Sequence, residues 1–125
     1  MNPIKSTISF QEFQNLDIRV CKILSIEKVP DTDKLYKMEI DTGLDKRLVV
    51  SAIADRLPIN VLEGAWLPFV LNLDPRVIKG IKSEAMIILG ETVNAKDLVL
   101  LSPVGGMHPD DEEEIDKYLI GATII

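Results

Sequence analysis

Apolar and polar side chains alternate in three successive segments, and this alternation constrains the fold more than any other feature of the sequence. The segments cover residues 17–27, 36–41 and 47–53. A period of two is typical of a β-strand with one buried face. Turn residues around Pro30 and Gly43 separate the segments, so the sequence predicts a three-stranded meander. Ile23 falls out of phase within the first segment, which predicts an irregularity midway along that strand.

Three further apolar segments, residues 66–71, 85–89 and 97–101, predict additional short strands. Pro68 in the first of them suits a strand near an edge or a bulge. A helical turn or loop is expected at residues 52–60, between the meander and these strands. Five or six short strands with one short helix after the third favour an all-β fold, a five-stranded oligonucleotide/oligosaccharide-binding (OB) barrel with short flanking helices. A β-sandwich would require more strands.

Both ends of the chain carry helix signals. Ser9 and Glu12 form a capping box that predicts a short helix, with an apolar side made by Phe10, Phe13 and Leu16. Pro109 and the acids after it predict a second helix that ends near Gly121, and the apolar residues 122–125 predict a docked tail. We therefore expect one domain over residues 1–125, with residues 1–16 as a helical extension and residues 104–125 as an acidic extension.

The net charge of −6 is concentrated in one place. Residues 110–117 contain six acids and one base, whereas the rest of the chain contains 14 acids and 13 bases. Outside the acidic segment the chain is nearly neutral, so its cations are able to cluster on one face. The overall charge therefore does not exclude a polyanionic partner, and binding to one is expected to be modest and salt-sensitive.

Residues suited to catalysis are scarce. His108 is the only histidine and Cys21 the only cysteine, and neither lies in a metal-binding or nucleophile motif. Cys21 falls within a predicted strand, which favours a packing role. We expect no enzyme activity, no cofactor and no metal. The sequence has no apolar run long enough to span a membrane and no secretory signal, and its single cysteine fits a reducing compartment, which together predict a cytoplasmic protein.

Cations are better placed than catalytic groups. Arg76, Lys79 and Lys82 recur at spacings of three between two apolar segments, where the Asp74-Pro75 step and Gly80 predict a loop. Asn72 and Ser83 flank these cations, and such neutral groups are able to read a base edge or a ribose hydroxyl. Asn72 is equally suited to satisfying the backbone groups of a turn.

Seven short segments, in order and at compatible spacing, resemble the tRNA-binding OB domain found at the C-terminus of many methionyl-tRNA synthetases, in free-standing tRNA-binding proteins and in the endothelial-monocyte-activating polypeptide. The segments are Asp17–Val20, Asp31–Tyr36, Asp41–Gly43, Lys46–Ser51, Asn72–Arg76, Lys79–Met86 and Leu100–Pro103. The resemblance implies a barrel that grips the outer corner of tRNA by shape. It also implies an accessory role, without chemistry, in trans to an aminoacyl-tRNA synthetase.

By position, the resemblance implies a set of tRNA contacts and a dimeric state. The contacts are Lys34, Asn72, Arg76, Ser83 and Met86, with Arg47 and Lys79 as supporting cations. Arg19 also matches the family pattern, but either a tRNA contact or a role within the barrel suits it. Free-standing members are typically homodimers that use segments outside the barrel.

The sequence departs from the family pattern at two places, and a second function is compatible with it. Ala85 stands where family members often have glycine, and the acidic segment 107–120 resembles an insertion that would oppose RNA binding if it lay near the RNA face. The alternative is a chaperone-like OB-fold dimer of the same family that binds peptides or proteins. An enzymatic function would depend on His108 and the acidic segment alone.

Overall fold

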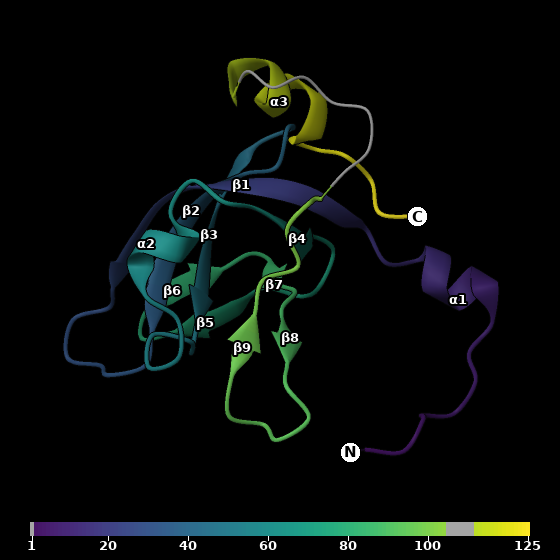
Figure 1. Cartoon of the computed structure of the whole chain (residues 1–125), viewed down its shortest axis with the longest axis horizontal. Helices are drawn as coiled ribbons and strands as arrows, with labels where there is room; N and C mark the ends of the chain where they lie inside the picture. Colours follow the sequence, from purple (N-terminus) through teal and green to yellow (C-terminus); the bar gives the residue numbers. More distant parts are fainter. Residues whose placement is uncertain (1, 105–111) are drawn as a thin grey trace.

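The computed structural model describes residues 2–104 and 112–125, with side chains from residue 113 onward in the second range. The expectations for His108 and for the residues from 105 to 111 lie outside this description. The elements in chain order are α1 (Phe10–Gln14), β1 (Ile18–Lys28), β2 (Tyr36–Asp41), β3 (Lys46–Ser51), α2 (Ile59–Leu62), β4 (Trp66–Val70), β5 (Arg76–Ile78), β6 (Ile81–Ser83), β7 (Met86–Ile87), β8 (Gly90–Glu91), β9 (Leu98–Val99) and α3 (Glu112–Leu119) (Figure 1).

Five of the strands form one antiparallel sheet in the order β3-β2-β1-β4-β7. The sheet curls until its two edges approach each other. The amide of Glu84, between β6 and β7, donates to the carbonyl of Leu48 on β3 at 2.9 Å and helps to close the seam. The predicted all-β barrel of the OB type is confirmed. Because β1 is the middle strand, it lies on the wall of the barrel opposite the seam between β3 and β7.

The predicted irregularity in β1 is also confirmed. The register with β2 shifts between Ile23 and Ser25, so one residue of β1 is left out of the pairing. Residues 18–22 pair with β4, and residues from Lys22 onward pair with β2. A bulge increases the local twist and bend of a strand. This bend allows one long strand to serve both halves of the barrel.

The barrel interior is filled mainly by aliphatic side chains, as the alternation predicted. Tyr36, Met38 and Ile40 of β2 are buried, whereas the residues between them are partly exposed. Phe69 and Leu67 of β4 are fully buried in the same core. The hydroxyl of Tyr36 donates to the carbonyl of Leu57 at 2.7 Å, which joins the segment before α2 to the barrel.

The segment between β4 and β7 differs from its prediction. Residues 76–83 form a β-hairpin, not an irregular loop, with β5 paired to β6. Lys79 and Gly80 at its tip have φ angles of 51° and 77°. Two central residues with positive φ are typical of the two-residue type I′ turn, which matches the twist of the flanking strands. The prediction was wrong because a lysine at the first turn position is an unusual signal for such a turn.

Two other strand predictions need adjustment. The third strand ends at Ser51, two residues earlier than expected, and the last strand is limited to Leu98–Val99. Strand β9 pairs with β8, which was not predicted. With only two residues each, β8 and β9 are too short to show an alternating pattern in the sequence.

Pro68 lies in a strand that is paired on both sides, yet it interrupts no hydrogen bond to β1. Its partner in register is Val20, whose N–H and C=O bond to Ala122 and Gly121 of the C-terminal tail, both at 2.8 Å. The side of Pro68 that lacks an N–H therefore faces β7, where the register ends at Phe69 and the carbonyl of Pro68 still accepts from the amide of Ile88 at 2.9 Å. The position is close to the edge of the pairing, as predicted.

The flanking segments follow their predictions where the structure describes them. Both halves of the capping box of α1 are present, between Ser9 and Glu12. The chain turns after α3 at Gly121, whose φ is 90°. Beyond it the amide of Ile124 donates to the carbonyl of Ile18 at 2.9 Å, so the tail is docked along the first residues of β1.

Candidate functional site

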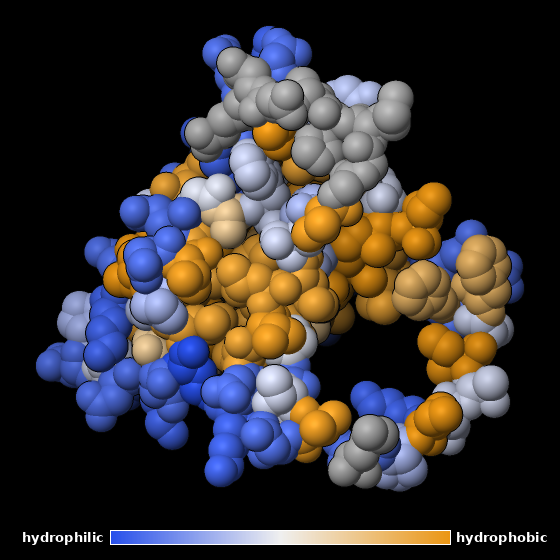
Figure 2. All heavy atoms as spheres, viewed as in Figure 1, coloured by the Kyte–Doolittle hydropathy of each residue, from blue (hydrophilic) through white to orange (hydrophobic). Residues whose placement is uncertain are grey.

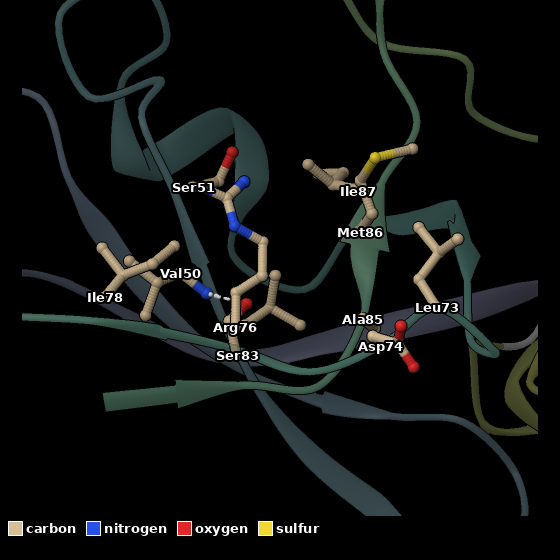
Figure 3. A pocket seen from close by; sticks show the side chains of 11 residues that line it. Val50, Ser51, Leu73, Asp74, Arg76, Ile78, Ser83, Ala85, Met86 and Ile87 are labelled. Atoms are coloured by element: carbon tan, nitrogen blue, oxygen red, sulfur yellow. Dashed lines mark hydrogen bonds between the residues drawn. The ribbon is translucent and has the colours of Figure 1, made fainter. Parts of the chain in front are cut away.

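A cavity of about 270 Å³ lies at the seam of the barrel, between β3, the β5–β6 hairpin and β7 (Figure 3). Most of its lining is apolar, and Ser51, Asp74, Arg76 and Ser83 supply the polar groups. The apolar lining consists of Val49, Val50, Leu73, Ile78, Ala85, Met86 and Ile87. A mostly apolar pocket with a few polar groups at its margin is typical of a binding site.

The pleat of the hairpin separates its two faces. Arg76, Ile78 and Ser83 line the cavity, whereas the pair formed by Val77 and Lys82 is exposed. Figure 3 shows the guanidinium of Arg76 extending over the cavity toward Ser51 at the end of β3. Because successive side chains of a strand point to opposite faces, the hairpin directs one cation into the cavity and another away from it.

Four of the predicted contact residues are exposed: Arg76 and Met86 line the cavity, Lys79 lies at the tip of the hairpin, and Lys34 lies before β2. Lys34, Arg76, Lys79 and Met86 have no side-chain hydrogen bond or ion pair to any described residue. Lys34 precedes β2. Its carbonyl accepts a hydrogen bond of 2.9 Å from the amide of Ala54, which lies just beyond the end of β3. An exposed cation without an internal partner is available to a phosphate group.

The other three predicted contact residues have partners within the fold. Asn72 accepts from the amide of Asp17 at 2.7 Å and donates to the carbonyl of Asn15 at 2.6 Å, which links the end of α1 to the end of β4. Ser83 is buried, and its Oγ accepts from the amide of Val50 at 3.0 Å. Arg47 donates to two backbone carbonyls and to Asp45. The structure therefore brings Arg76, Ser83 and Met86 to one cavity, with Arg47 and Asn72 beside it, whereas Lys34 and Lys79 are not part of its lining.

Arg19 and Ala85 also have defined surroundings. The Nε of Arg19 lies 2.9 Å from a carboxylate oxygen of Asp17, so this cation is paired within the fold. Ala85, where the family pattern often has glycine, lines the cavity and packs against the core.

The wall opposite the cavity carries the acidic helix α3. Asp116 accepts hydrogen bonds from the Nζ of Lys22 at 2.9 Å and from the indole N–H of Trp66 at 2.7 Å. The same ammonium lies 5.4 Å from the centre of the Trp66 ring. Burial alone raises the pKa of Asp116, but the hydrogen bonds and the charge of Lys22 outweigh it and the pKa is lowered. This carboxylate therefore holds α3 against β1 and β4.

The position of α3 determines how far its acidic side chains lie from the cations of the hairpin. Helix α3 contacts β1, which is the middle strand of the sheet, whereas the hairpin contacts β3 at the seam. Figure 1 shows α3 beyond β1, on the side away from β5 and β6. The described acids of the C-terminal extension therefore do not lie beside the exposed cations of the hairpin.

A second hollow of about 240 Å³ lies between α1 and the C-terminal tail. Its apolar lining comprises Phe10, Phe13, Leu16, Ile18, Ile124 and Ile125. No residue of α1 is buried, and Phe10 is 73% exposed. Figure 2 shows apolar side chains across the centre of this face and toward α1, whereas the left-hand edge is mostly hydrophilic.

The described residues contain little that is suited to catalysis. Cys21 is fully buried, and desolvation raises the pKa of its thiol to about 12, which suits packing and not nucleophilic attack. Within residues 2–104 and 113–125, no group of three or more His, Cys, Asp or Glu side chains is arranged to hold a metal ion. No helix in the described part of the chain is long and apolar enough to cross a membrane.

Fold and surface together define a small β-barrel binding domain of the OB class, with a cavity and exposed cations at its seam. Residues 18–111 match the model of the family described as putative tRNA binding domain. This chain belongs to that family.

The chain is similar to methionine–tRNA ligases and to solved structures of related proteins. The chain is 43% identical over 110 residues to a methionine–tRNA ligase of Parabacteroides distasonis, a match that covers 88% of this chain and 16% of that protein. The chain thus spans about a sixth of the length of this relative. A crystal structure of a MetRS-related protein from Pyrococcus horikoshii superposes with a TM-score of 0.81 at 29% identity, over 97% of this chain and all of that one. The chaperone CsaA from Bacillus anthracis superposes with a TM-score of 0.74 at 27% identity, over 96% of this chain and all of that one.

Sequence reasoning missed two groups of side chains around these surfaces. Ser51 lines the cavity, and its position at the end of the third predicted strand was the available signal. Asp116, Lys22 and Trp66 form the opposite cluster, and no local pattern connects them because the contact joins residues 50 and 94 positions apart.

Proposed function

We propose that this chain is a non-catalytic tRNA-binding module that grips tRNA by its shape and backbone through the seam of the barrel. The observation that carries the proposal is the exposed Arg76 at the cavity, with Lys79 and Lys34 also exposed and none of the three paired with a described residue, on a chain whose family is a tRNA-binding one. Phosphate contacts position a nucleic acid and do not depend on base sequence. The module therefore binds different tRNAs with similar affinity.

Individual residues take different roles in this proposal. Lys34, Arg76 and Lys79 contact phosphates, and Met86 at the rim of the cavity contacts a base or a ribose. Ser83 and Asn72 shape the surface through the backbone groups that they bind, and each keeps some capacity for a further hydrogen bond to RNA. Arg47 adds positive charge near the seam.

The resemblance to methionine–tRNA ligases supports a partner for this module. A separate tRNA-binding domain raises the local concentration of tRNA near an enzyme when the two associate. We propose that the module assists an aminoacyl-tRNA synthetase in trans, in the cytoplasm, where aminoacylation takes place.

A homodimer is part of the proposal. The hollow between α1 and the tail exposes aromatic and aliphatic side chains that a second copy would cover. Sedimentation of Phe10→Asp and Phe13→Asp variants tests this arrangement, and both should be monomeric where the unmodified chain is a dimer. Leu44→Asp is the matched control for Phe10→Asp because Leu44 is 77% exposed, close to the 73% of Phe10, but lies in the β2–β3 turn. A dimer that tolerates the aspartates at α1 contradicts the proposed interface.

The direct test is a tRNA-binding titration of the chain at increasing salt, by filter retention or fluorescence anisotropy. Binding should be seen at low salt and should weaken steeply as salt rises. Arg76→Ala and Lys34→Ala should weaken it for all tRNAs alike, whereas Lys117→Ala on α3 removes the same charge and should have little effect. Absence of tRNA retention by the folded chain at low salt would overturn the proposal.

A second candidate function is a chaperone-like dimer that binds peptides or proteins through the same barrel. Two observations favour it: the apolar lining of the cavity and the match to the chaperone CsaA along nearly the whole chain. An unfolded polypeptide should then compete with tRNA or bind where tRNA does not. Ala85→Leu, which narrows the cavity without changing charge and leaves the proposed tRNA contacts in place, should alter polypeptide binding more than tRNA binding.

A further inference from the structure

The two ends of the hairpin-bearing segment, residues 72–83, meet at one side chain of β3. The Nη1 of Arg47 donates to the carbonyl of Leu71 at 2.7 Å and to the carbonyl of Glu84 at 3.2 Å. Leu71 immediately precedes this segment and Glu84 immediately follows it. Five of the residues that line the cavity belong to it: Leu73, Asp74, Arg76, Ile78 and Ser83. A single guanidinium nitrogen therefore ties both ends of the segment to the barrel.

The β2–β3 turn fixes the direction of the Arg47 side chain. Its Nε lies 3.1 Å and 3.3 Å from the two carboxylate oxygens of Asp45. The hydroxyl of Thr42, which is only 1% exposed, donates toward Asp45 and accepts from the amides of Leu44 and Asp45. The hydrogen bond from Thr42, and then that from Arg47, lower the pKa of Asp45, so this carboxylate is ionised at neutral pH. Arg47 is thus held between a fixed carboxylate and two fixed carbonyls.

This arrangement leaves little of Arg47 for RNA. Nε and both hydrogens of Nη1 are used within the fold, and among the described residues only Nη2 has no partner. The side chain is 25% exposed. Arg76, by contrast, is exposed and has no side-chain partner among the described residues.

We propose that Arg47 is a positioning residue for the tRNA-binding surface, one that fixes the hairpin-bearing segment on β3 so that Arg76 and the cavity are correctly placed. This inference rests on the proposed function. It deepens that function by assigning Arg47 to the support of the binding surface, not to the phosphates. The fork of a guanidinium reaches one carboxylate and two carbonyls at the same time, which the single ammonium of lysine does not reproduce.

The barrel does not depend on Arg47 alone for its closure, so the variants should fold. The amide of Glu84 bonds to Leu48, and the hydroxyl of Ser83 bonds to the amide of Val50. These two hydrogen bonds hold the β6 end of the segment. The Leu71 end keeps its own hydrogen bonds to the segment after α1, from the amide of Leu71 to the carbonyl of Asp17 at 2.8 Å and through Asn72, so loss of Arg47 removes the link from this end to β3.

The experiment compares tRNA dissociation constants for Arg47→Lys, Arg47→Ala and Asp45→Asn, well below the melting temperature of each folded variant. A positioning role predicts that Arg47→Lys weakens binding about tenfold, nearly as much as Arg47→Ala, because the charge remains but the bridge is lost. Asp45→Asn distinguishes an electrostatic role of Arg47 from a positioning role, because the two predict opposite changes in tRNA affinity. It makes the chain less negative by one charge, so a purely electrostatic role predicts tighter binding, whereas a positioning role predicts binding about threefold weaker. A purely structural role would lower the melting temperature and leave all three dissociation constants unchanged.

Amide hydrogen exchange of the full-length chain without tRNA provides the independent readout. Exchange in residues 72–83 should accelerate in Arg47→Lys and Asp45→Asn, while β1 and β2 remain protected. Full tRNA affinity of Arg47→Lys, or unchanged exchange in this segment, would overturn the positioning role. If the unmodified chain does not bind tRNA at all, the proposed function fails, and the exchange measurement still decides whether Arg47 holds the segment.

Discussion

Charged side chains on opposite walls of this barrel differ in whether they are paired within the fold. On the wall of β1 and β4, Lys22 is bound by Asp116 and lies over the ring of Trp66. At the seam, Arg76 and Lys79 of the hairpin are exposed and have no side-chain partner among the described residues. A charge whose hydrogen bonds are used within the fold has few left for a ligand, whereas an unpaired exposed charge remains available to one. A net charge of −6 therefore does not indicate which partners the chain binds, because binding depends on where the unpaired charges lie on the barrel.

The largest expected effect comes from reversing the charge at the seam. Arg76→Glu should weaken tRNA binding on the order of thirtyfold at low salt, because a phosphate contact is lost and a repulsive charge replaces it. The melting temperature should stay the same, since Arg76 has no side-chain partner among the described residues to lose. Filter binding and calorimetry measure the two quantities.

Lys117→Glu is the matched control on the opposite wall. Lys117 lies 3.7 Å from Glu114 in an exposed pair, which contributes little to stability. If this reversal weakens tRNA binding as much as Arg76→Glu does, binding depends on net charge alone and the distinction between the walls disappears.

A smaller effect, on stability and not on binding, is expected from Asp116→Ala. The variant leaves Lys22 and the indole N–H of Trp66 without their carboxylate, so the free energy of unfolding should fall by about 1–3 kcal/mol. The tRNA dissociation constant should be nearly unchanged because α3 lies away from the seam. Urea denaturation followed by Trp66 fluorescence measures the stability. Glu63→Ala removes the same charge from an exposed acid without a side-chain partner among the described residues, and it should leave stability unchanged.

The same cluster predicts a dependence on pH. The folded-state pKa of Asp116 lies below its ordinary value of 3.8, because its hydrogen bonds and the charge of Lys22 outweigh burial. A depressed pKa contributes stability that is present above 3.8 and is lost as the pH falls through the lower folded-state value. Trp66 is the only tryptophan, so its fluorescence should be constant from neutral pH down to about 5 and change only at lower pH. The transition should be absent in Asp116→Asn, and a transition near neutral pH would contradict the assignment.

The sequence predicted the strands better than the side-chain contacts between them, for a physical reason. The meander, the bulge at Ile23 and the buried alternation of β2 follow from a local period of two. The contacts of Asp116, Asn72 and Arg47 join residues far apart in the chain, and for Asn72 and Arg47 they include backbone carbonyls that look the same in every residue. Residue type alone therefore indicated cations near the seam but not which of them the fold would occupy.

The smallest expected effect is at the tip of the hairpin, where Lys79 has a φ of 51°. Asparagine tolerates this conformation better than lysine and is favoured before glycine in a type I′ turn. Lys79→Asn should therefore raise the free energy of unfolding by about 0.5–1 kcal/mol. It should also weaken tRNA binding by about two- to fivefold and lower the salt slope by about 1, because one phosphate contact is lost.

Lys79→Arg distinguishes strain from charge at the same position. It keeps the positive charge and the strained backbone, so both stability and tRNA affinity should match those of the unmodified chain. Together the two variants test whether the cation at the seam lowers the stability of the hairpin. No such cost is expected on the wall of β1 and β4, because the cation there is paired. If Lys79→Asn is more stable and still binds tRNA with full affinity and an unchanged salt slope, Lys79 is an ordinary surface lysine. The contrast between the walls then depends on Arg76 and Lys34.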